Sequence, residues 1–301
     1  MSDHTRKRAE GPWVERPSFS VDLPSGKVLD STDRPLIMGI LNVTPDSFSD
    51  GGEFFRPDLA VEHAEMMEAE GADIIDVGGE STRPGSEPVE VDEEMRRVLP
   101  VIEELAAETD VPISVDTQKS DVAREAISCG ADMVNDVSGM RADPEMANVV
   151  AESGVGCCLM HMQGRPQNMQ ENPSYEDVVQ DVAAWMERRL DCAERHGVDP
   201  GRIFLDPGFG FGKTPQHNLE LLRRLNAFHD LGCPVMVGTS RKSTLGEILD
   251  AGADERLYGS LATVTAAVMS GCHMVRVHDV APTLDTVLVC EAIRQGSEWL
   301  K

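Results

Sequence analysis

Basic residues that could bind an anion gather in a few short segments of a strongly acidic chain. Arg276 and His278 alternate in "VRVHDV", Arg241 and Lys242 are neighbours in "GTSRKS", and Arg83 lies in "GGESTRPGSEP". Residues two apart on a strand point to the same face, so we expect Arg276 and His278 side by side. Positive groups at loop starts in a chain with a formal net charge of −26 indicate a negatively charged ligand.

A second set of chemically active residues consists of carboxylates and an amide, each at the end of an apolar run. Asp116 follows "ISV", Asn135 follows "GADMV" and Asp206 follows "IFL". Their oxygens suit the N–H donors of a flat heterocycle with an amino-pyrimidinone edge, and Lys242 suits its carbonyl. Any one of these residues is equally well explained as a hydrogen-bonding group buried in a barrel, so only the whole set indicates a ligand site.

Asn42 ends another apolar run, "IMGIL". Its side chain is neutral and carries an oxygen. It is therefore a plausible single protein ligand for Mg²⁺, which would otherwise be bound by phosphate oxygens and water.

The glycine-rich segment "LDPGFGFGKT" matches neither of the nucleotide motifs that it suggests. Pro207 stands where a phosphate loop has its first glycine, and Pro207 has no N–H to donate. The spacing of Gly208, Gly210 and Gly212 also departs from the dinucleotide fingerprint. Its two phenylalanines, among them Phe211, could cover a planar ligand or pack beneath the loop.

The elements that must position these residues follow a repeated pattern from Pro35 onward, in which short apolar runs alternate with longer helix-period segments. The predicted strands span residues 36–41, 72–77, 112–115, 132–135, 155–160, 203–205, 234–237 and 273–277. Predicted helices include residues 58–70, 92–107, 119–128, 175–196 and 216–227. Strands that alternate with helices in this way predict a (β/α)8 TIM barrel, whose chemistry lies at the C-terminal ends of the strands. A doubly wound open sheet is the alternative.

The N-terminal region differs from the rest of the chain. We expect residues 1–15 to be a flexible leader, residues 16–34 a hairpin-like segment, and residues 35–301 one barrel domain. No stretch has the apolar length of a signal peptide or a membrane span. The seven cysteines are scattered without a C-x-x-C pair, which is typical of reduced thiols in a cytoplasmic protein.

The charge of the whole chain limits its partners. It has 53 acidic and 27 basic residues, a balance that resembles the surfaces of proteins from salt-loving organisms. Nucleic acid is excluded as a partner, because its phosphates would be repelled.

Seven segments, in this order, closely resemble the dihydropteroate synthase family: "MGILNVTPDSFSDGG", "DVGGESTRPG", "SVDTQKS", "NDVSG", "LDPGFGFGK", "GTSRKS" and "RVHDV". The resemblance implies a (β/α)8 barrel, typically a homodimer, that acts in folate synthesis. Such enzymes join 6-hydroxymethyl-dihydropterin pyrophosphate to p-aminobenzoate with Mg²⁺ and release pyrophosphate.

The resemblance also implies roles for individual residues. The pterin would be held by Asp116, Asn135, Asp206 and Lys242, in a pocket lined by Met160 and Phe211. The pyrophosphate and its Mg²⁺ would be held by Asn42, Arg276 and His278. The p-aminobenzoate would be framed by Thr82, Arg83, Pro84 and Ser240. The mobile first loop, which covers the reacting centre, would contain Asp46 and Phe48. The residues expected to take part in the reaction are Asn42, Asp46, Phe48, Arg83, Asp116, Lys242, Arg276 and His278.

Other readings remain open at this point. A methyltransferase that uses methyl-tetrahydrofolate would share the pterin pocket, and a pterin-binding protein could lack catalysis. A Schiff-base aldolase would need Lys242 to be desolvated, and the polar turn that Lys242 shares with Arg241 argues against this. The segment that carries Phe48 could also be an ordinary surface loop.

Overall fold

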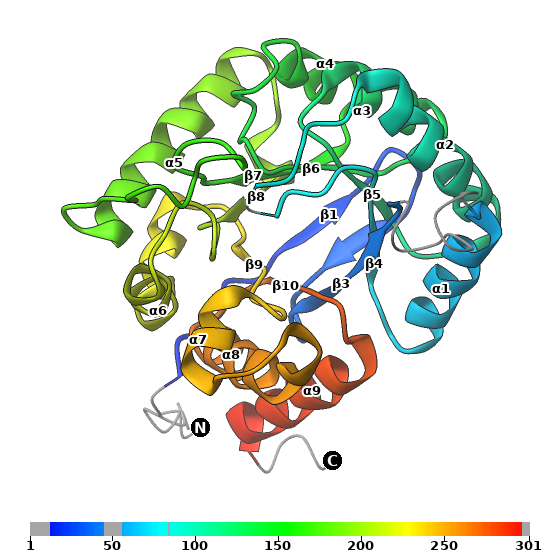
Figure 1. The fold of residues 1–301 in the computed structure, drawn as a ribbon. Helices are drawn as coiled ribbons and strands as arrows, with labels where there is room; N and C mark the ends of the chain where they lie inside the picture. Colours follow the sequence, from blue (N-terminus) through cyan, green and yellow to red (C-terminus); the bar gives the residue numbers. More distant parts are fainter. Residues whose placement is uncertain (1–12, 45–55, 84, 297–301) are drawn as a thin grey trace, which may run out of the picture.

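A closed barrel of parallel strands forms the centre of the molecule in the computed structural model, which describes residues 13–44, 56–83 and 85–296 (Figure 1). The barrel strands are β3 (Leu36–Asn42), β4 (Ile74–Gly78), β5 (Ile113–Asp116), β6 (Met133–Asp136), β7 (Gly156–Met160), β8 (Ile203–Asp206), β9 (Met236–Val237) and β10 (Met274–Val277). They follow the order β8-β7-β6-β5-β4-β3-β10-β9. The two ends of this sheet meet where the N–H of Leu205 donates to Pro234 O at 2.9 Å. The predicted (β/α)8 barrel is confirmed, and the open sheet is wrong.

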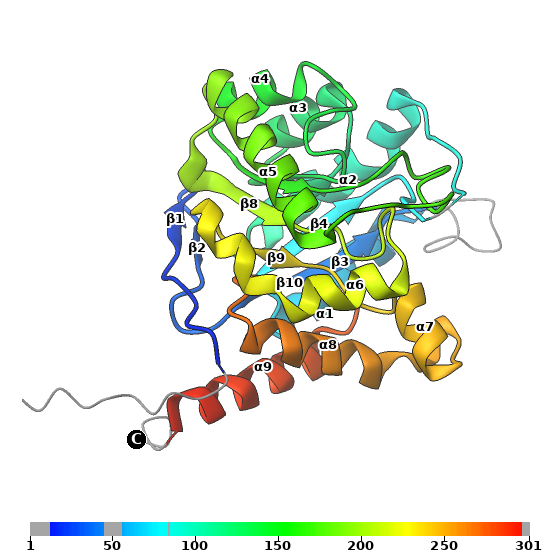
Figure 2. The same cartoon turned by 90° about the vertical axis from the view of Figure 1, so that its left-hand side faces the viewer.

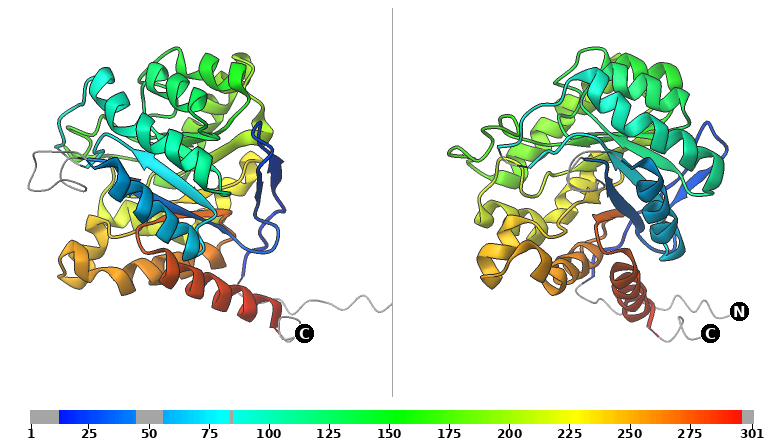
Figure 3. Two further views of the ribbon diagram at one scale, coloured as in Figure 1. Left: turned by 90° about the vertical axis from the view of Figure 1, so that its right-hand side faces the viewer. Right: turned by 45° about the vertical axis from the view of Figure 1, so that its right-hand side comes forward.

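Helices surround the strands on the outside of the barrel (Figures 1 and 3). They are α1 (Pro57–Ala69), α2 (Val91–Glu108), α3 (Ser120–Ser128), α4 (Met146–Ser153), α5 (Val178–Arg195), α6 (Pro215–Arg223), α7 (Ser243–Leu249), α8 (Leu257–Met269) and α9 (Val280–Gln295). The start of α6 shows why a helix begins where it does. Thr214 and His217 cap each other, and Pro215 occupies the first helical position. Among the described helices, none has the length and apolar character needed to cross a membrane.

Side chains alternate along the strands and so divide the apolar residues into two clusters. Outward-facing residues such as Ile75, Val115 and Val134 pack with the helices. The intervening positions in the first half of the strands face inward and form the barrel floor: Met38, Ile74, Met133, Cys158, Phe204, Met236 and Met274. Because all of these are buried, the barrel is a filled core rather than a channel.

A short antiparallel pair, β1 (Ser20–Asp22) and β2 (Val28–Asp30), covers this floor at one end of the barrel (Figure 2). Leu23 and Leu29 belong to the same cluster as the floor residues, and Phe19 meets Phe204 edge-on at 4.9 Å between ring centroids. The pair therefore seals the end of the barrel that lies opposite the C-terminal ends of the strands.

The contribution of this seal to stability can be measured. Leu29→Ala should lower the free energy of unfolding by about 2–4 kcal/mol, because Leu29 is 1% exposed and its loss leaves a cavity. Val28 on the same strand is 49% exposed, so Val28→Ala should change that free energy by about 0.5 kcal/mol or less. Urea unfolding at one salt concentration compares the two variants. Equal losses would show that β2 does not seal the floor.

Candidate active site

Polar side chains replace the apolar ones at the inward-facing positions nearer the C-terminal ends of the strands. They are Asp76 on β4, Ser114 and Asp116 on β5, Asn135 on β6, Asp206 on β8 and Arg276 on β10. All except Arg276, which is half-buried, are buried. We call these six residues the polar layer. Buried polar groups must find partners within the protein, so this layer either bonds to itself or to a ligand.

Arg276 joins three strands across this layer. Its Nε donates to Asp76 Oδ2 at 2.6 Å and its Nη2 donates to Asp116 Oδ2 at 2.7 Å. Asn135 Nδ2 donates to the same Asp76 oxygen at 2.9 Å. Burial alone would lower the pKa of Arg276, but the two carboxylates outweigh burial and raise it, so the guanidinium stays charged. Among the described residues, none accepts a hydrogen bond from Arg276 Nη1.

Asp116 is the carboxylate whose protonation responds most to this setting. Burial raises the pKa of Asp116 above its ordinary value, and Arg276 opposes this rise. Asp76, Glu94 and Asp136 are like charges that add to it. Asp116 is therefore poised to change its charge much closer to neutral pH than a solvated aspartate.

Asp206 and Lys242 stand on the other side of Arg276. A Cβ placed on Gly238 would lie 3.7 Å from Arg276 Cβ and 3.9 Å from Asp206 Oδ2. Arg276 and Asp206 are therefore close to each other, on either side of Gly238. Lys242 Nζ donates to Phe209 O at 2.6 Å and lies 4.1 Å from the centroid of the Phe211 ring. Lys242 as a whole is half-buried, yet its amine end is enclosed by these two groups.

This enclosure changes the chemistry of Lys242. Burial lowers the pKa of Lys242 to about 7, Asp206 opposes the change and Arg276 adds to it. The sequence-based argument that a polar turn keeps Lys242 solvated is therefore wrong. The local sequence shows Arg241 and two serines beside Lys242, whereas the groups that enclose it come from the loop after β8, some thirty residues earlier.

The loop after β8 has an internal support that the sequence did not reveal. Lys213 is buried, and its Nζ lies 2.9 Å from His161 Nδ1, 2.9 Å from Gly208 O and 3.0 Å from Phe211 O. Burial lowers the pKa of Lys213 well below its ordinary value and that of His161 to about 2. Lys213 thus fixes the backbone that carries Phe211. The sequence signal for Lys213 is its place at the end of a segment like a phosphate loop, and Pro207 breaks that motif.

The two residues predicted to line the pterin pocket lie in one apolar group. Met160, the last residue of β7, and Phe211 cluster with Val137, Met162 and Met169. Since Phe211 also contacts Lys242, this apolar group borders the Asp206–Lys242 side of the polar layer.

His278 follows β10 and pairs with Ser240. Ser240 Oγ accepts from the backbone N–H of His278 at 3.2 Å and lies 3.0 Å from His278 Nδ1. Because the hydroxyl already accepts from the backbone, donating its own proton to Nδ1 would leave the imidazole proton on Nε2. Burial, with Arg276 and Arg241 nearby, lowers the pKa of His278 to about 4, so the ring is neutral at pH 7.

Arg241 does not join the other basic groups. Its Nε donates to Asp279 Oδ2 at 3.0 Å, and it also pairs with Asp254. The expectation that Arg241 faces an anionic ligand is wrong, because a nearby carboxylate of the following loop already neutralises it.

The segment after β4 carries two of the predicted residues, Thr82, which is half-buried, and Arg83, which is exposed. Lys119 forms ion pairs with Glu80 and with the buried Glu94 of α2, which anchors the start of this segment. Thr82 and Arg83 therefore extend from a fixed base.

Asn42 ends β3 and is half-buried. No described residue forms a hydrogen bond with its side chain. In the described parts of the chain there is no group of three or more His, Cys, Asp or Glu that could hold a metal ion. The neutral amide oxygen of Asn42 fits a metal ion that brings most of its own oxygen ligands. Asp46, Phe48 and Pro84 lie outside the described residues, so the proposed lid stays a prediction.

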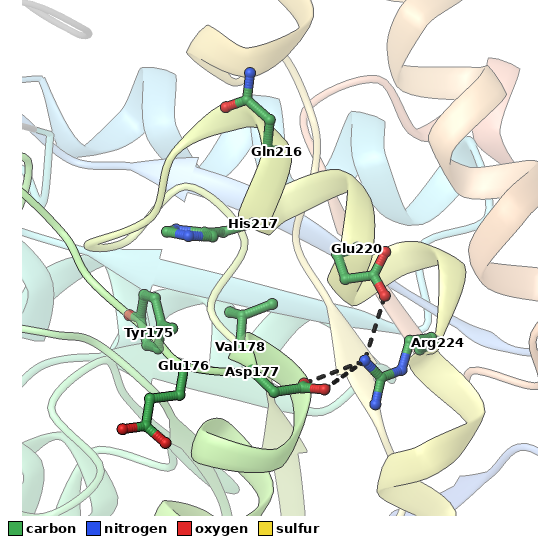
Figure 4. A pocket seen from close by; sticks show the side chains of 8 residues that line it. All are labelled: Tyr175, Glu176, Asp177, Val178, Gln216, His217, Glu220 and Arg224. Carbon is green, nitrogen blue, oxygen red and sulfur yellow. Dashed lines mark hydrogen bonds and ion pairs between the residues drawn. The ribbon is translucent and has the colours of Figure 1, made fainter.

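A hollow of about 380 Å³ lies outside the barrel, between the start of α5 and α6 (Figure 4). Three of its charged groups satisfy one another, since Arg224 Nη1 donates to Asp177 Oδ2 at 2.9 Å and to Glu220 Oε1 at 3.3 Å. The polar layer, with its perturbed carboxylates and the neighbouring Lys242, is the better candidate for chemistry.

Comparisons with known proteins agree on one family. The family described as pterin binding enzyme matches residues 38–278. The dihydropteroate synthase of Escherichia coli (strain K12) is 49% identical over 265 residues, which cover 88% of this chain and 94% of that protein. The Xanthomonas albilineans dihydropteroate synthase with 4-aminobenzoic acid has a TM-score of 0.87 and 45% identity, covering 93% of this chain and 100% of that one. The same enzyme in complex with 7,8-dihydropteroate has a TM-score of 0.83 and 42% identity, with the same coverage.

The enclosure of Lys242 leads to a direct prediction. NMR titration of its ζ-amine should give a midpoint near pH 7, because burial favours the neutral form. Asp206→Asn should lower this midpoint further, since the carboxylate favours the charged amine. Lys242→Arg assigns the signal by removing it. A midpoint near that of a solvated lysine, about 10.4, would contradict the enclosure.

Proposed function

This chain belongs to the pterin-binding enzymes, and among them to the dihydropteroate synthases, and we propose that its polar layer carries out their reaction. The reaction condenses 6-hydroxymethyl-7,8-dihydropterin pyrophosphate with p-aminobenzoate to give 7,8-dihydropteroate and pyrophosphate. The observation that carries the proposal is the junction of Arg276 with Asp76 and Asp116, beside Asp206 and Lys242. One place in the fold thus combines carboxylates for a heterocycle with a cation, Arg276, for a diphosphate.

The pterin ring would be recognised by the buried acceptors of the polar layer. Asp116, Asn135 and Asp206 accept from ring and amino N–H groups, and Lys242 donates to the ring carbonyl. Charge-assisted hydrogen bonds of this kind are strongest where water is excluded. Met160 and Phe211 supply an apolar wall for the flat faces of the ring.

The diphosphate would be bound by the part of Arg276 that the carboxylates leave open. Nε and Nη2 use one edge of the planar guanidinium. The other edge consists of Nη1 and the second Nη2 proton, and this edge matches two oxygens of a phosphate. His278 is neutral, so it would donate through Nε2 rather than act as a second cation.

Mg²⁺ is proposed to arrive with the diphosphate. Asn42 would supply one amide oxygen, and phosphate oxygens and water would supply the rest. When bound, the ion offsets charge on the leaving group.

The bond changes need no nucleophile from the protein. The C–O bond between the methylene carbon and the diphosphate breaks, and its electron pair leaves with the diphosphate, whose charge Arg276 offsets. Asp116 and Asp206 stabilise the resulting cation on the pterin side. The neutral amine of p-aminobenzoate then forms the new C–N bond and releases a proton to solvent. Arg83 suits the carboxylate of p-aminobenzoate, with Thr82, Pro84 and Ser240 framing its ring.

The decisive experiment supplies the purified protein with dihydropterin pyrophosphate, p-aminobenzoate and Mg²⁺. We expect 7,8-dihydropteroate and pyrophosphate in equal amounts. Methyl transfer from methyl-tetrahydrofolate, or pterin binding with no product, would overturn the proposal in favour of the methyltransferase or the carrier.

The role of Asn42 predicts a specific kinetic change. Asn42→Ala should raise the Mg²⁺ concentration for half-maximal activity about tenfold, the loss expected for about 1.4 kcal/mol of binding energy. Affinity for 6-hydroxymethylpterin, which lacks the diphosphate, should stay the same in a calorimetric titration. Loss of pterin affinity at an unchanged Mg²⁺ requirement would assign Asn42 to the ring instead.

A homodimer is proposed from the exposed apolar side chains of three neighbouring helices, α7, α8 and α9 (Figures 1 and 2). These side chains are Ile248, Leu249, Tyr258, Val289 and Ile293. Large apolar side chains exposed on contacting helices indicate an interface, and a second copy is the partner that the family resemblance implies.

This interface can be tested by charge insertion. Val289→Glu with Ile293→Glu should convert the dimer to a monomer in light scattering after gel filtration, because burying the new carboxylates is costly. Met66→Glu, on the exposed face of α1, is the matched control and should leave the mass unchanged. A dimer that survives the double change would place the interface elsewhere.

We also propose that the protein is located in the cytoplasm. Seven free thiols in the described chain are compatible with the cytoplasm, and the net charge of −26 is compatible with a salt-rich one.

A further inference from the structure

Asp76 belongs to the polar layer, and the proposed function names it only as a partner of Arg276, without a contact to either substrate. It is 0% exposed on β4, which places it between β3 and β5. Its Oδ2 accepts from two residues at once, Arg276 Nε and Asn135 Nδ2. The two residues that it holds are thus assigned to different substrate parts, the diphosphate and the pterin.

For Arg276, Asp76 decides which edge of the guanidinium is used up. Asp116 alone would hold Nη2 by one bond, about which the planar group could turn. The second bond, from Nε to Asp76, fixes the plane and leaves the Nη1 edge for the diphosphate.

For Asn135, Asp76 decides which end of the amide meets the ligand. Asp76 is an acceptor, so it selects Nδ2 and turns Oδ1 away from itself. Without Asp76 the amide could flip, and it would present a donor where the pterin also has donors.

We infer that Asp76 is a positioning residue for the proposed reaction: one buried carboxylate oxygen sets both the edge of Arg276 and the end of Asn135 that face the substrates. This inference rests on the proposed function, because it concerns the same site.

The second oxygen of Asp76 provides a clean variant. Asp76 Oδ1 is buried without a hydrogen-bond partner among the described residues, and so is the hydroxyl of Ser114. Asp76 and Ser114 are register partners on neighbouring parallel strands, so their side chains lie on the same face. Asp76→Asn can keep its oxygen on Arg276 and Asn135 and direct its new NH₂ towards Ser114. This variant removes the charge and retains the hydrogen bonds.

The charge of Asp76 has a separate, measurable effect on Asp116. The charged groups that act on Asp116 are Arg276 from β10, Asp76 from β4, Glu94 from α2, Asp136 from β6 and Lys242 at the start of α7. Burial is the main cause of the raised pKa of Asp116, and Asp76 raises it further as a like charge. Removing that charge must lower the pKa, so Asp116 would stay ionised to lower pH.

The experiment compares three variants with the wild type. Affinity for 6-hydroxymethylpterin is titrated calorimetrically between pH 5 and 9, and the kinetics of both substrates are measured at pH 7.5. Pterin affinity should fall at low pH as Asp116 becomes protonated, and we call this fall the acid limb. Asp76→Asn should shift the midpoint of the acid limb to lower pH by about half a unit or more. Asp76→Ala should lower kcat/KM for the pterin pyrophosphate about a hundredfold, the effect of a small misplacement, and leave KM for p-aminobenzoate within about twofold.

Glu291→Gln is the matched control, because Glu291 is also 0% exposed and paired with an arginine, Arg16, but lies on α9 outside the polar layer. It should leave both the limb and the kinetics unchanged. The inference is overturned if the pH dependence of pterin binding is unchanged in Asp76→Asn. It is also overturned if Asp76→Ala loses kcat/KM equally for both substrates and melts at a lower temperature, because Asp76 would then be a structural residue. The proposed function is judged separately, by whether the wild type makes dihydropteroate, whereas the pterin titration needs no turnover.

Discussion

The site depends on one buried charge arrangement, an arginine shared by two aspartates inside a closed barrel. Removing a charge from water costs several kcal/mol unless it is paired and hydrogen-bonded, so Arg276 can lie in the barrel only because Asp76 and Asp116 meet it there. The two aspartates also leave part of the guanidinium of Arg276 unbonded. The pairing uses one edge of the guanidinium and leaves net negative charge on the carboxylate side, where a cationic pterin would form, and donors on the diphosphate side.

The rest of the fold keeps this arrangement rigid and dry. The inward apolar floor and the β1–β2 pair close the barrel beneath the polar layer. On one side, buried Lys213 fixes the loop that carries Phe211, and Phe211 in turn encloses the amine of Lys242. On the other side, Lys119 anchors the segment that carries Thr82 and Arg83. Each support reaches a predicted substrate contact through backbone or side-chain bonds, so the supports act on geometry and not only on stability.

Local sequence patterns predicted the strands and the polar residues at their ends, because the two-residue alternation and the position of a strand end are local properties. Asp116, Asn135, Asp206 and Arg276 were found in this way. Patterns could not show pairing between distant residues. Arg276 lies 200 positions from Asp76 in the sequence, and only the folded structure shows the hydrogen bond between them. That hydrogen bond is what identifies Asp76 as important. The same limit explains Lys242, whose enclosure comes from another loop, and Arg241, whose partner Asp279 lies 38 positions away.

In the proposed reaction, Arg276 binds the departing diphosphate with one edge of its guanidinium while two aspartates hold the other edge. A crystal structure of the wild type with pyrophosphate and 6-hydroxymethylpterin tests it most directly. We expect diphosphate oxygens within about 3 Å of Nη1 and Nη2, with Nε still bonded to Asp76. A diphosphate bound elsewhere, or an Arg276 that loses its bonds to both aspartates when it binds the diphosphate, would show that this arrangement is not the one used.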